Sequence, residues 1–397
     1  MFFRNTAIVC AAVLVFWVCG CATIARDGRQ RLRAGDLGGA IELFNLHLVE
    51  HPQDWKIREQ LAYALLKNGE EKSAIDAFLA VLADNPVASN SLLYLGIAYV
   101  KDDQLRNGIA AWNRFLDVGA TRQVREVRRL LTLLSIAESH LFAHESLSPN
   151  GASGSDSASR RQLAALYYND LSAEKGLRSV QKSLAAMMLS DFAQVDGLTV
   201  VTRLQMEAFL SEMGFPRTGL VETARVAAIG PHLGAEFLLY GTLSTLLKDL
   251  RVNTTIALAS TGAVKGTFLS AESLDRFYVL QKKVVFSVIE RLGYRLPDRT
   301  QGHLDPPHTT NFNAFLHFGR GLDALDEGEW EVAKVFFEKA VDEDSGFDLA
   351  REALDTCPTG IGIAYEPIVR MGMDPRSRKL VADRMEEIVD GLTAFPR

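Results

Sequence analysis

The sequence predicts an α+β protein in which helical repeats flank a mixed-sheet α/β sandwich domain. A 34-residue helical period fills the first third of the chain, strand-length apolar runs alternate with helices over residues 163–292, and helical spacing returns after residue 313. The predicted division is a signal peptide at 1–20, repeats with a capping helix at 21–148, a flexible linker at 149–160, the α/β domain at 161–296, a linker at 297–311 and repeat-like helices at 312–397.

The bulk composition is that of a globular protein. The chain has 397 residues, of which 48% are hydrophobic and 23% are charged, so it is long enough for two or three domains. Its formal net charge of -6 leaves no basic footprint for a nucleic acid. We therefore expect no nucleic-acid partner.

The N-terminal segment has the pattern of an export signal. Arg4 precedes an apolar run, Ala7–Val18, that is shorter than the roughly 20 residues of a bilayer-spanning helix. The run ends in Val18-Cys19-Gly20-Cys21, which resembles the lipobox of bacterial lipoproteins, and this resemblance implies lipidation at Cys21. Ala22 after that cysteine favours the outer membrane, so we expect an anchor on its periplasmic face. An ordinary secretory signal or an uncleaved anchor is the alternative.

Cysteine usage narrows the possible chemistry. Two of the four cysteines leave with the signal and one is lipidated, so the mature chain keeps Cys357 alone. A single thiol excludes an internal disulfide and falls short of the four ligands of a structural zinc site. We expect Cys357 to be a buried or simply unpaired cysteine rather than a reactive one.

From Gly28 to about Gly119, small and aromatic residues recur every 34 positions. The recurring sets are Pro52 and Pro86; Ala40, Ala74 and Gly108; Phe44, Phe78 and Trp112; Leu61 and Leu95; and Ala62 and Gly96. This pattern resembles the tetratricopeptide repeat, in which small residues let two antiparallel helices approach and the aromatic fills the gap between them. The concave surfaces of such repeats bind extended peptides or helices of other proteins. Four residues on the inner helices are therefore candidate partner contacts: Tyr63, Asn90, Tyr94 and Lys101.

The helix expected at Gln123–Glu145 presents one apolar face and is suited to cap the repeats. It carries His140 and His144 four residues apart. Two histidines supply only part of the ligands of a metal site, and the sequence offers no further ligands nearby. We therefore expect neither a metal nor another cofactor. Small residues over 149–160 then favour a flexible linker.

The α/β block alternates strand and helix before it ends in consecutive strands. A crossover helix between the first two strands allows them to pair in parallel, and short turns make the last three an antiparallel meander. The expected strands are Leu163–Tyr168, Leu198–Thr202, Glu236–Leu243, Leu250–Ala259 and Ala263–Ser270. The expected helices are Leu177–Ala193, Gln205–Met213, Val221–Leu233 and Leu274–Leu292.

Several stretches of this block resemble the curli-assembly (CsgG-type) family of periplasmic lipoprotein domains, whose fold is also similar to peptidoglycan-synthase activator lipoproteins. The resemblance rests on residues 163–169, 189–194, 197–203, 233–241 and 250–255. It covers about a third of the chain and implies assembly, secretion or regulation at the envelope, with homo-oligomerisation through this domain as in the pore-forming relatives. The turns after Leu243 and Ser260 are too short for membrane-crossing hairpins of about 10 residues per strand, which argues against a pore.

A last helical segment follows residue 312. Gly321, Ala324, Ala333, Phe337 and Ala340 repeat the small and aromatic spacing, with a turn at Gly328-Glu329. A single repeat cannot bury its own faces. It must pack on residues 348–355, on the terminal helix 375–392 or on the α/β block.

The sequence contains no motif of a nucleotide site, a hydrolase elbow or a metalloprotease, and we expect a protein that is not an enzyme. The favoured function is a lipid-anchored periplasmic scaffold or accessory protein for envelope assembly or secretion, which binds other envelope proteins through its repeats. Activation of a peptidoglycan synthase is the alternative. An enzyme with an unrecognised site is the weakest hypothesis.

Overall fold

A computed structural model of the full chain describes residues 23–148, 161–172, 177–214, 229–246 and 248–393. The chain forms two compact units. Unit 1 contains the residues up to Leu131 together with those from Met371 onward, and unit 2 contains Thr132–Arg370. The predicted signal peptide, the lipidation site Cys21 and the predicted linker at 149–160 lie outside the described residues.

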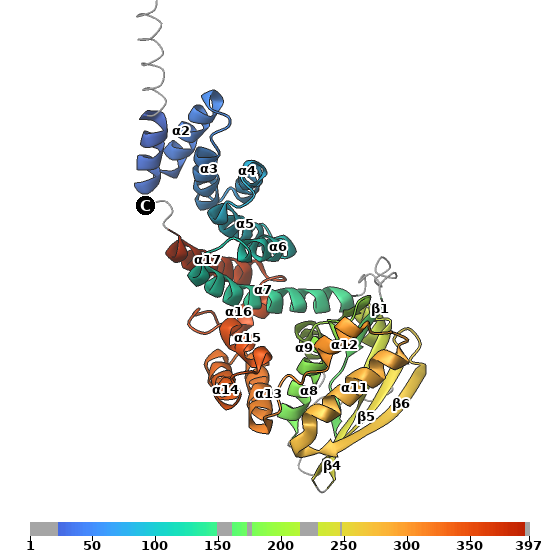
Figure 1. Cartoon of the computed structure of the whole chain (residues 1–397). Coiled ribbons are helices and arrows are strands. Elements are labelled where there is room, and N and C mark those ends of the chain that lie inside the picture. The colour runs from blue at the N-terminus through green and yellow to red at the C-terminus, as the bar shows by residue number, and fades with distance from the viewer. Residues whose placement is uncertain (1–22, 149–160, 173–176, 215–228, 247, 394–397) are drawn as a thin grey trace, which may run out of the picture. The chain divides into compact units, whose positions relative to one another are not determined.

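Unit 1 consists of helical hairpins with a 34-residue spacing (Figure 1). Its helices are 23–33, α2 (Leu37–Glu50), α3 (Trp55–Lys67), α4 (Glu71–Asp84), α5 (Ser89–Lys101), α6 (Leu105–Leu116), the first part of α7 (Thr121–Leu147) and α17 (Pro375–Leu392). The predicted tetratricopeptide-type hairpins are confirmed, since α3 pairs with α4 and α5 pairs with α6. The helix expected at 123–145 is confirmed as α7 and extends two residues further at each end, but its residues from Thr132 onward group with unit 2.

Close helix approach in these hairpins depends on the small residues that the pattern marked. A Cβ added at Gly96 would lie 2.0 Å from Nε1 of Trp112, and one added at Gly28 would lie 2.7 Å from the ring of Phe44. The Trp112 indole is fully buried and donates a hydrogen bond to the Leu93 carbonyl at 2.9 Å. The aromatic therefore fills the space that the missing side chain leaves.

Unit 2 is built around a mixed sheet with strand order β3-β1-β4-β5-β6, to which a short β2 adds beside β4. The strands are β1 (Arg161–Ala165), β2 (Asn169–Asp170), β3 (Leu198–Val200), β4 (Phe237–Leu246), β5 (Asp249–Leu258) and β6 (Val264–Ser273). β1 pairs in parallel with β3 and with β4, and β4, β5 and β6 form an antiparallel meander. Both predicted pairing patterns are confirmed, whereas the two-residue β2 was not predicted because it has no periodicity of its own.

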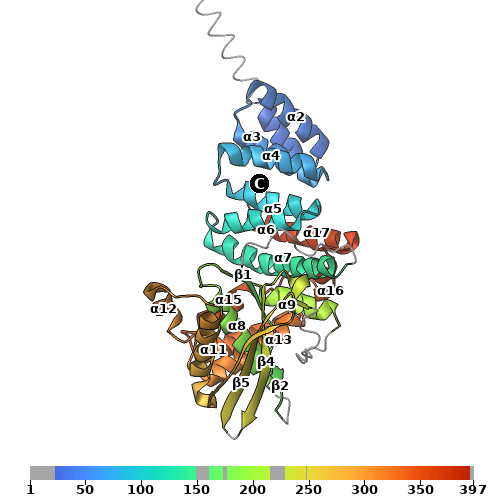
Figure 2. The same ribbon diagram turned by 90° about the vertical axis from the view of Figure 1, so that its right-hand side faces the viewer.

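Helices cover both faces of this sheet (Figure 2). On one face, Leu163, Phe237 and Val252 share a core with α8 (Arg178–Phe192) and α11 (Phe277–Arg291). On the other face, Ala164 and Leu238 share a smaller core with α9 (Arg203–Glu212) and the 3₁₀ turn η1 (Gly230–Leu233). The alternation of neighbouring residues between two cores follows from the two-residue period of a strand.

The predicted helix at 221–233 is described only at its end. Residues 221–228 lie outside the described part of the chain, and the final four residues form η1 rather than an α-helix. A 3₁₀ turn is common where a helix ends, and Gly234, with a φ of 63°, follows this one. The predicted helix at 274–292 is confirmed, but it begins with the 3₁₀ turn η2 (Leu274–Arg276).

The repeat-like hairpin after residue 312 belongs to unit 2 and not to a separate domain. Its helices α13 (Phe312–Asp326) and α14 (Trp330–Glu343) pair as predicted, and Gly321 faces the Phe337 ring. The hairpin packs through α13 on α8, and α15 (Asp348–Thr356) packs on α14. Of the three packing partners that the sequence allowed for this hairpin, it therefore uses two, the α/β block and residues 348–355.

Two predicted boundaries differ from the structure. The predicted linker at 297–311 contains the helix α12 (Asp298–Leu304), and its Leu304 and Thr309 are buried. The predicted C-terminal domain at 312–397 is divided, because residues up to the short helix α16 (Tyr365–Arg370) group with the sheet while α17 packs on α5 in unit 1. Sequence spacing predicted α13, α14 and α17 but not α12, and it did not predict which neighbours these helices pack on.

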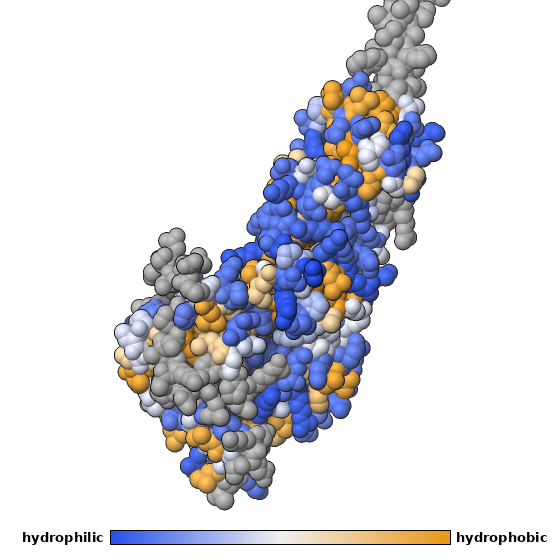
Figure 3. Space-filling view, turned by 180° about the vertical axis from the view of Figure 1, so that it is seen from behind, coloured by the Kyte–Doolittle hydropathy of each residue, from blue (hydrophilic) through white to orange (hydrophobic). Residues whose placement is uncertain are grey.

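The surface carries scattered apolar side chains. Figure 3 shows apolar side chains on the N-terminal helices of unit 1. Among the apolar residues of α2, Leu46 and Val49 are 51% and 79% exposed. No helix among the described residues has the length and apolar character that are needed to cross a bilayer.

Candidate functional site: the inner face of the N-terminal repeats

The inner face of unit 1 is formed by the first helices of consecutive repeats, α3 and α5, which lie in contact. Lys67 and Lys101 occupy the last positions of these helices and are 34 residues apart in the sequence. Because each repeat reproduces the geometry of the preceding one, residues one period apart lie on the same face. The repeat therefore presents two lysines side by side.

The helix α17 lies on this face (Figure 1). Asp374 caps its first turn by accepting hydrogen bonds from the backbone N–H groups of Arg376 and Ser377, and Pro375 occupies the first helical position. Four of its apolar side chains are buried, whereas Leu380 is 59% exposed; the buried ones are Val381, Ala382, Met385 and Val389. The chain thus supplies a helix of its own to the surface that the sequence marked for a partner.

Ionic contacts form a ladder across the interface between α17 and the two lysines. Glu386 lies between them, with carboxylate oxygens 2.7 Å from Nζ of Lys67 and 2.5 Å from Nζ of Lys101. Asp390 extends the ladder at one end, 2.6 Å from Lys67, and Asp383 extends it at the other, 3.2 Å from Lys101. Three carboxylates and two ammonium groups therefore alternate along the groove.

The tyrosines of the inner face lie at one end of the ladder. The hydroxyl of Tyr94 donates a hydrogen bond to Asp390 at 3.0 Å and lies 2.7 Å from the Thr393 hydroxyl. The Tyr63 ring packs edge-on against Tyr94, with the ring centroids 4.9 Å apart, and Lys67 lies over its face. Tyr94 is fully buried, whereas Asp390 beside it keeps 34% of its side chain exposed.

The protonation equilibria reflect this burial. Burial raises the pKa of Tyr63 to about 12 and raises the pKa of Tyr94 further, so both remain neutral hydrogen-bonding groups. Burial by itself lowers the pKa values of Lys67 and Lys101, but the carboxylates of α17 outweigh it, and both pKa values are raised. The two lysines are therefore charged throughout the physiological pH range.

Two further contacts hold the two ends of α17. Near its beginning, Arg378 pairs with Asp103 at 3.0 Å, and at its end Gln123 donates a hydrogen bond to the Leu392 carbonyl at 3.0 Å. Asp103 has a φ of 63°, at the turn position where the two preceding repeats have Gly35 and Gly69. An aspartate in this left-handed conformation carries a backbone cost that a glycine does not, and here its side chain faces α17.

The four residues predicted as partner contacts differ in how they meet α17. Tyr94 and Lys101 contact α17 directly, Tyr63 contacts it through Tyr94 and Lys67, and Asn90 lies half-buried at the start of α5. Lys67 was not predicted, although its 34-residue spacing from Lys101 marks it. The carboxylates of α17 were not predicted either, although their spacing on one helix face is visible in the sequence.

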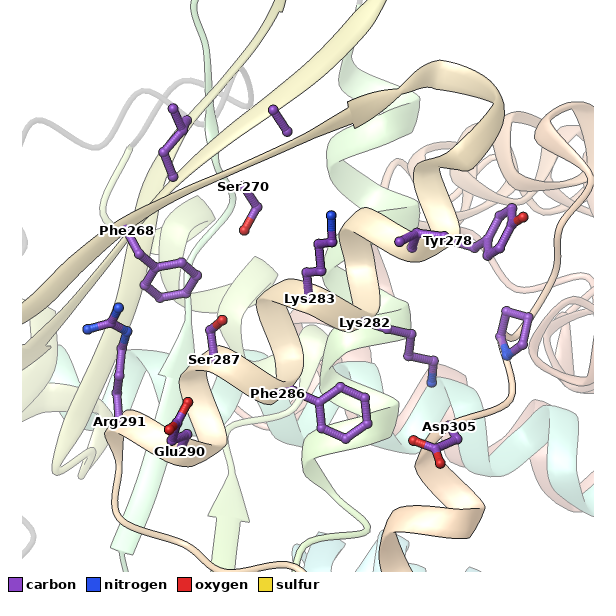
Figure 4. Close-up of a pocket in the computed structure, with 14 residues that line it drawn as sticks. Phe268, Ser270, Tyr278, Lys282, Lys283, Phe286, Ser287, Glu290, Arg291 and Asp305 are labelled. Carbon is purple, nitrogen blue, oxygen red and sulfur yellow. The ribbon is translucent and has the colours of Figure 1, made fainter.

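A second concave surface lies in unit 2, between β6 and α11 (Figure 4). Its pocket has a volume of about 860 Å³ and is lined by aromatic and cationic side chains: Phe268, Tyr278, Phe286, Lys282, Lys283 and Arg291. The cations already have contacts, since Lys282 binds Asp191, Lys283 pairs with Glu272 and the Arg291 guanidinium lies over the Phe268 ring. The surface has the character of a shallow binding groove rather than of a reaction centre.

Asp191 behind this pocket holds the segment at 305–309 against the sheet domain. Its buried carboxylate accepts hydrogen bonds from Gln281 at 2.8 Å and Lys282 at 2.8 Å, and lies 2.9 Å from Nε2 of His308. Burial tends to raise its pKa, but these partners outweigh that effect and the pKa is lowered. Both oxygens of Asp191 thus have hydrogen-bond or ionic partners, as expected for a carboxylate with a structural role.

A second buried ionic cluster joins α8, α9 and α13. Asp326 pairs with Lys182 at 2.9 Å and with Arg203, and Lys182 also pairs with Glu207. The side chains of Lys182 and Asp326 are only 5% and 7% exposed. These charges fasten the repeat-like hairpin to the sheet domain.

His140 of α7 and Cys357 lie in surroundings that indicate a structural role. His140 is buried, with Nδ1 3.5 Å from Glu212 and Nε2 3.4 Å from the Tyr365 hydroxyl, whereas His144 is exposed. No group of three or more histidine, cysteine, aspartate or glutamate side chains among the described residues is placed to hold a metal ion. Cys357 is buried outside any disulfide, and its thiol faces the Trp330 carbonyl at 3.4 Å, which confirms the expected buried cysteine.

No protein-family model matches the sequence, and no curated protein matches it significantly. Among solved structures, the TPR domain of P58(IPK) is similar at 12% identity over 94% of this chain and 84% of that chain, with a TM-score of 0.30. The yeast Sti1 TPR2AB domain in complex with pHSP90 is similar at 13% identity over 90% and 99% of the two chains, with a TM-score of 0.29.

A tetratricopeptide repeat protein from Parabacteroides merdae is similar at 14% identity over 85% of this chain and 84% of that chain, with a TM-score of 0.26. TM-scores of this size carry no argument about function. The assignment of the repeats rests on their spacing and packing in this chain.

Proposed function

We propose that this protein is a lipid-anchored scaffold on the periplasmic face of the outer membrane, which binds envelope proteins through the inner face of its N-terminal repeats. One observation supports this function above all: the inner face holds a helix, α17, through a charge-matched and partly buried surface. A groove that accepts a helix of its own chain has the shape and chemistry to accept a helix of another protein.

The anchoring part of the proposal rests on the sequence. Cys21 ends an apolar segment of signal-peptide length and follows small residues, the pattern of acylated lipoproteins. Two or three acyl chains, at roughly 0.8 kcal/mol per buried CH₂ group, give firm attachment to a bilayer. The role in assembly or secretion comes from the resemblance of residues 163–292 to curli-assembly domains.

Photo-crosslinking in cells tests the scaffold function. A crosslinking amino acid at Asn90, on the inner helix α5, should capture a discrete envelope protein, whereas one at the exposed Lys72 on the outer helix α4 should not. Identical products from both positions, or none from Asn90, would contradict binding at the inner face. A peptidoglycan synthase as the captured protein would favour synthase activation over assembly or secretion.

Metabolic labelling with a palmitate analogue tests the anchor. The full chain expressed in a Gram-negative host should incorporate the label and fractionate with outer membranes, and Cys21→Ser should abolish both. Cys19→Ser is the matched control, since it changes a neighbouring cysteine and should leave the labelling intact. Label retained by Cys21→Ser would exclude this anchor.

A further inference from the structure

The helix α17 carries two parallel stripes of residues with the same spacing. Its carboxylates Asp383, Glu386 and Asp390 stand at positions i, i+3 and i+7, and so do the buried Ala382, Met385 and Val389 one residue earlier. Residues three, four and seven positions apart lie on one side of a helix. The apolar stripe therefore faces the repeats while the acidic stripe runs along its edge, opposite the lysines.

Water reaches the two ends of the acidic stripe, whereas Glu386 at its centre is only 8% exposed. The side chains of Lys67 and Lys101 are 23% and 17% exposed, and those of Asp390 and Asp383 are 34% and 48% exposed. Ion pairs with this exposure contribute little net stability one by one and are screened by salt. They select the charge pattern of the bound helix without fixing that helix in place.

Glu387 shows that the acidic stripe is specific to one side of α17. This neighbour of Glu386 points away from the lysines, pairs with Arg384 on the same helix and is 66% exposed. Two adjacent glutamates thus differ only in the face that they occupy. The chain therefore contains its own control for the role of the stripe.

We infer that α17 is an exchangeable ligand of the inner face, and that the partner which replaces it presents an acidic amphipathic helix. The replacing helix has carboxylates at i, i+3 and i+7 beside an apolar stripe shifted by one residue. Because α17 is tethered, it competes at a high effective concentration and keeps the groove closed until such a helix is supplied. This inference rests on the proposed function and gives it a partner class and a means of regulation.

A synthetic peptide of residues 374–393 tests the exchange on the full chain. Glu386→Lys should release α17 while both groove lysines remain, so the labelled peptide should bind this variant at least about tenfold more tightly than the wild-type chain. The Glu387→Lys chain should behave as the wild type. A folded Glu386→Lys chain, judged by circular dichroism, that does not bind the peptide would overturn the inference.

Peptide variants test the charge pattern. Replacing the residues that correspond to Asp383, Glu386 and Asp390 by their amides should weaken binding about tenfold, and the same change at Glu387 should have no effect. Raising the salt concentration should weaken binding of the acidic peptide and leave binding of the amide peptide nearly unchanged. Equal binding of the acidic and amide peptides would show that the groove does not read the acidic stripe.

Hydrogen exchange on the wild-type chain avoids any dependence on the folding of a variant. Excess peptide should accelerate amide exchange in α17 and leave exchange in α4 unchanged, because only α17 is displaced. If saturating peptide leaves hydrogen exchange in α17 unaltered, the peptide does not displace α17, and the inference is overturned. The two proposals can fail independently. The peptide experiments test whether the groove releases α17, whereas crosslinking at Asn90 tests whether a partner protein binds in cells.

Discussion

Two repeat-type helices of this protein dock on a neighbouring helix, and they do so in different ways. In unit 1, α5 receives α17 with rim ion pairs that are open to water. In unit 2, α13 docks on α8 at so short a distance that a Cβ on Gly319 would lie 1.9 Å from the Ser179 carbonyl oxygen. The same helical hairpin thus provides an accessible binding face in one place and a permanent part of a core in the other.

The difference lies in how completely charge and backbone are removed from water. The side chains of the Lys182–Asp326 pair are both at most 7% exposed. In unit 1 only Glu386 is comparably buried, at 8%, while its partners and the flanking carboxylates are 17–48% exposed: Lys67, Lys101, Asp383 and Asp390. A buried ion pair that loses one partner leaves an uncompensated charge, which is far more costly than the loss of an exposed pair. Unit 2 should therefore respond strongly to substitutions at its interface and unit 1 weakly.

The largest effect is expected at the buried cluster of unit 2. Asp326→Ala leaves Lys182 and Arg203 buried without their shared carboxylate and should lower the free energy of unfolding by about 3–5 kcal/mol, measured by urea titration. Asp348→Ala, which removes an exposed pair with Arg351, should cost less than about 0.5 kcal/mol. If Asp326→Ala lowers the free energy of unfolding by less than about 1 kcal/mol, the buried pairs of unit 2 do not differ from the more exposed pairs of unit 1.

The close approach of α13 and α8 should be almost as sensitive. Gly319→Ala places a methyl group against the Ser179 carbonyl and should cost about 2–3 kcal/mol of unfolding free energy, with faster hydrogen exchange in α13. The control is Gly302→Ala in α12, where the added methyl group meets nothing within 4 Å. It should be neutral or slightly stabilising, because alanine favours a helix.

A smaller effect is expected in the groove of unit 1. Glu386→Ala removes a carboxylate shared by Lys67 and Lys101 and should weaken protection of α17 in hydrogen exchange by about 1.5 kcal/mol. Glu387→Ala should change it by less than about 0.5 kcal/mol. Equal effects at the two positions would mean that burial of the apolar stripe alone holds α17.

The smallest effect concerns the acid limit of unit 2. Because the pKa of Asp191 is lowered from 3.8, its ionised form stabilises the fold above that pH, and this contribution is lost as the pH falls through the lower folded pKa. Asp191→Asn should therefore cost about 1 kcal/mol at neutral pH, and the difference should shrink below pH 3.8 in urea titrations.

The exposed Asp298→Asn is the control for this titration and should leave the pH profile unchanged. A difference for Asp191→Asn that stays constant down to the lowest pH would show that its charge does not matter.

Local chemistry made much of the fold predictable. Gly96 and Trp112 predict a close hairpin because a small residue and an aromatic 16 positions later meet wherever two short helices turn back on each other. The same spacing at Gly321 and Phe337 predicted the hairpin of unit 2. Strand alternation likewise predicted the parallel pair and the meander, because each depends on connections of a few residues or one helix.

The candidate site was only half predictable for the opposite reason. Tyr94 and Lys101 could be selected as residues of an inner face, but their contact with Asp390 and Glu386 joins positions nearly 300 residues apart. An amphipathic acidic helix fits more than one neighbour, and nothing in its own sequence states which neighbour it meets.

The sequence by itself therefore determined most of the helices and strands and the repeat hairpins, and it contains the spacing that places two lysines one repeat apart. Only the tertiary structure decided that α17 lies on the N-terminal repeats and that the second hairpin is packed into the sheet domain. The physical reason is range: periodicity and turn chemistry act over a few residues, whereas the match of an acidic stripe to two lysines becomes visible only when the folded chain brings the surfaces together.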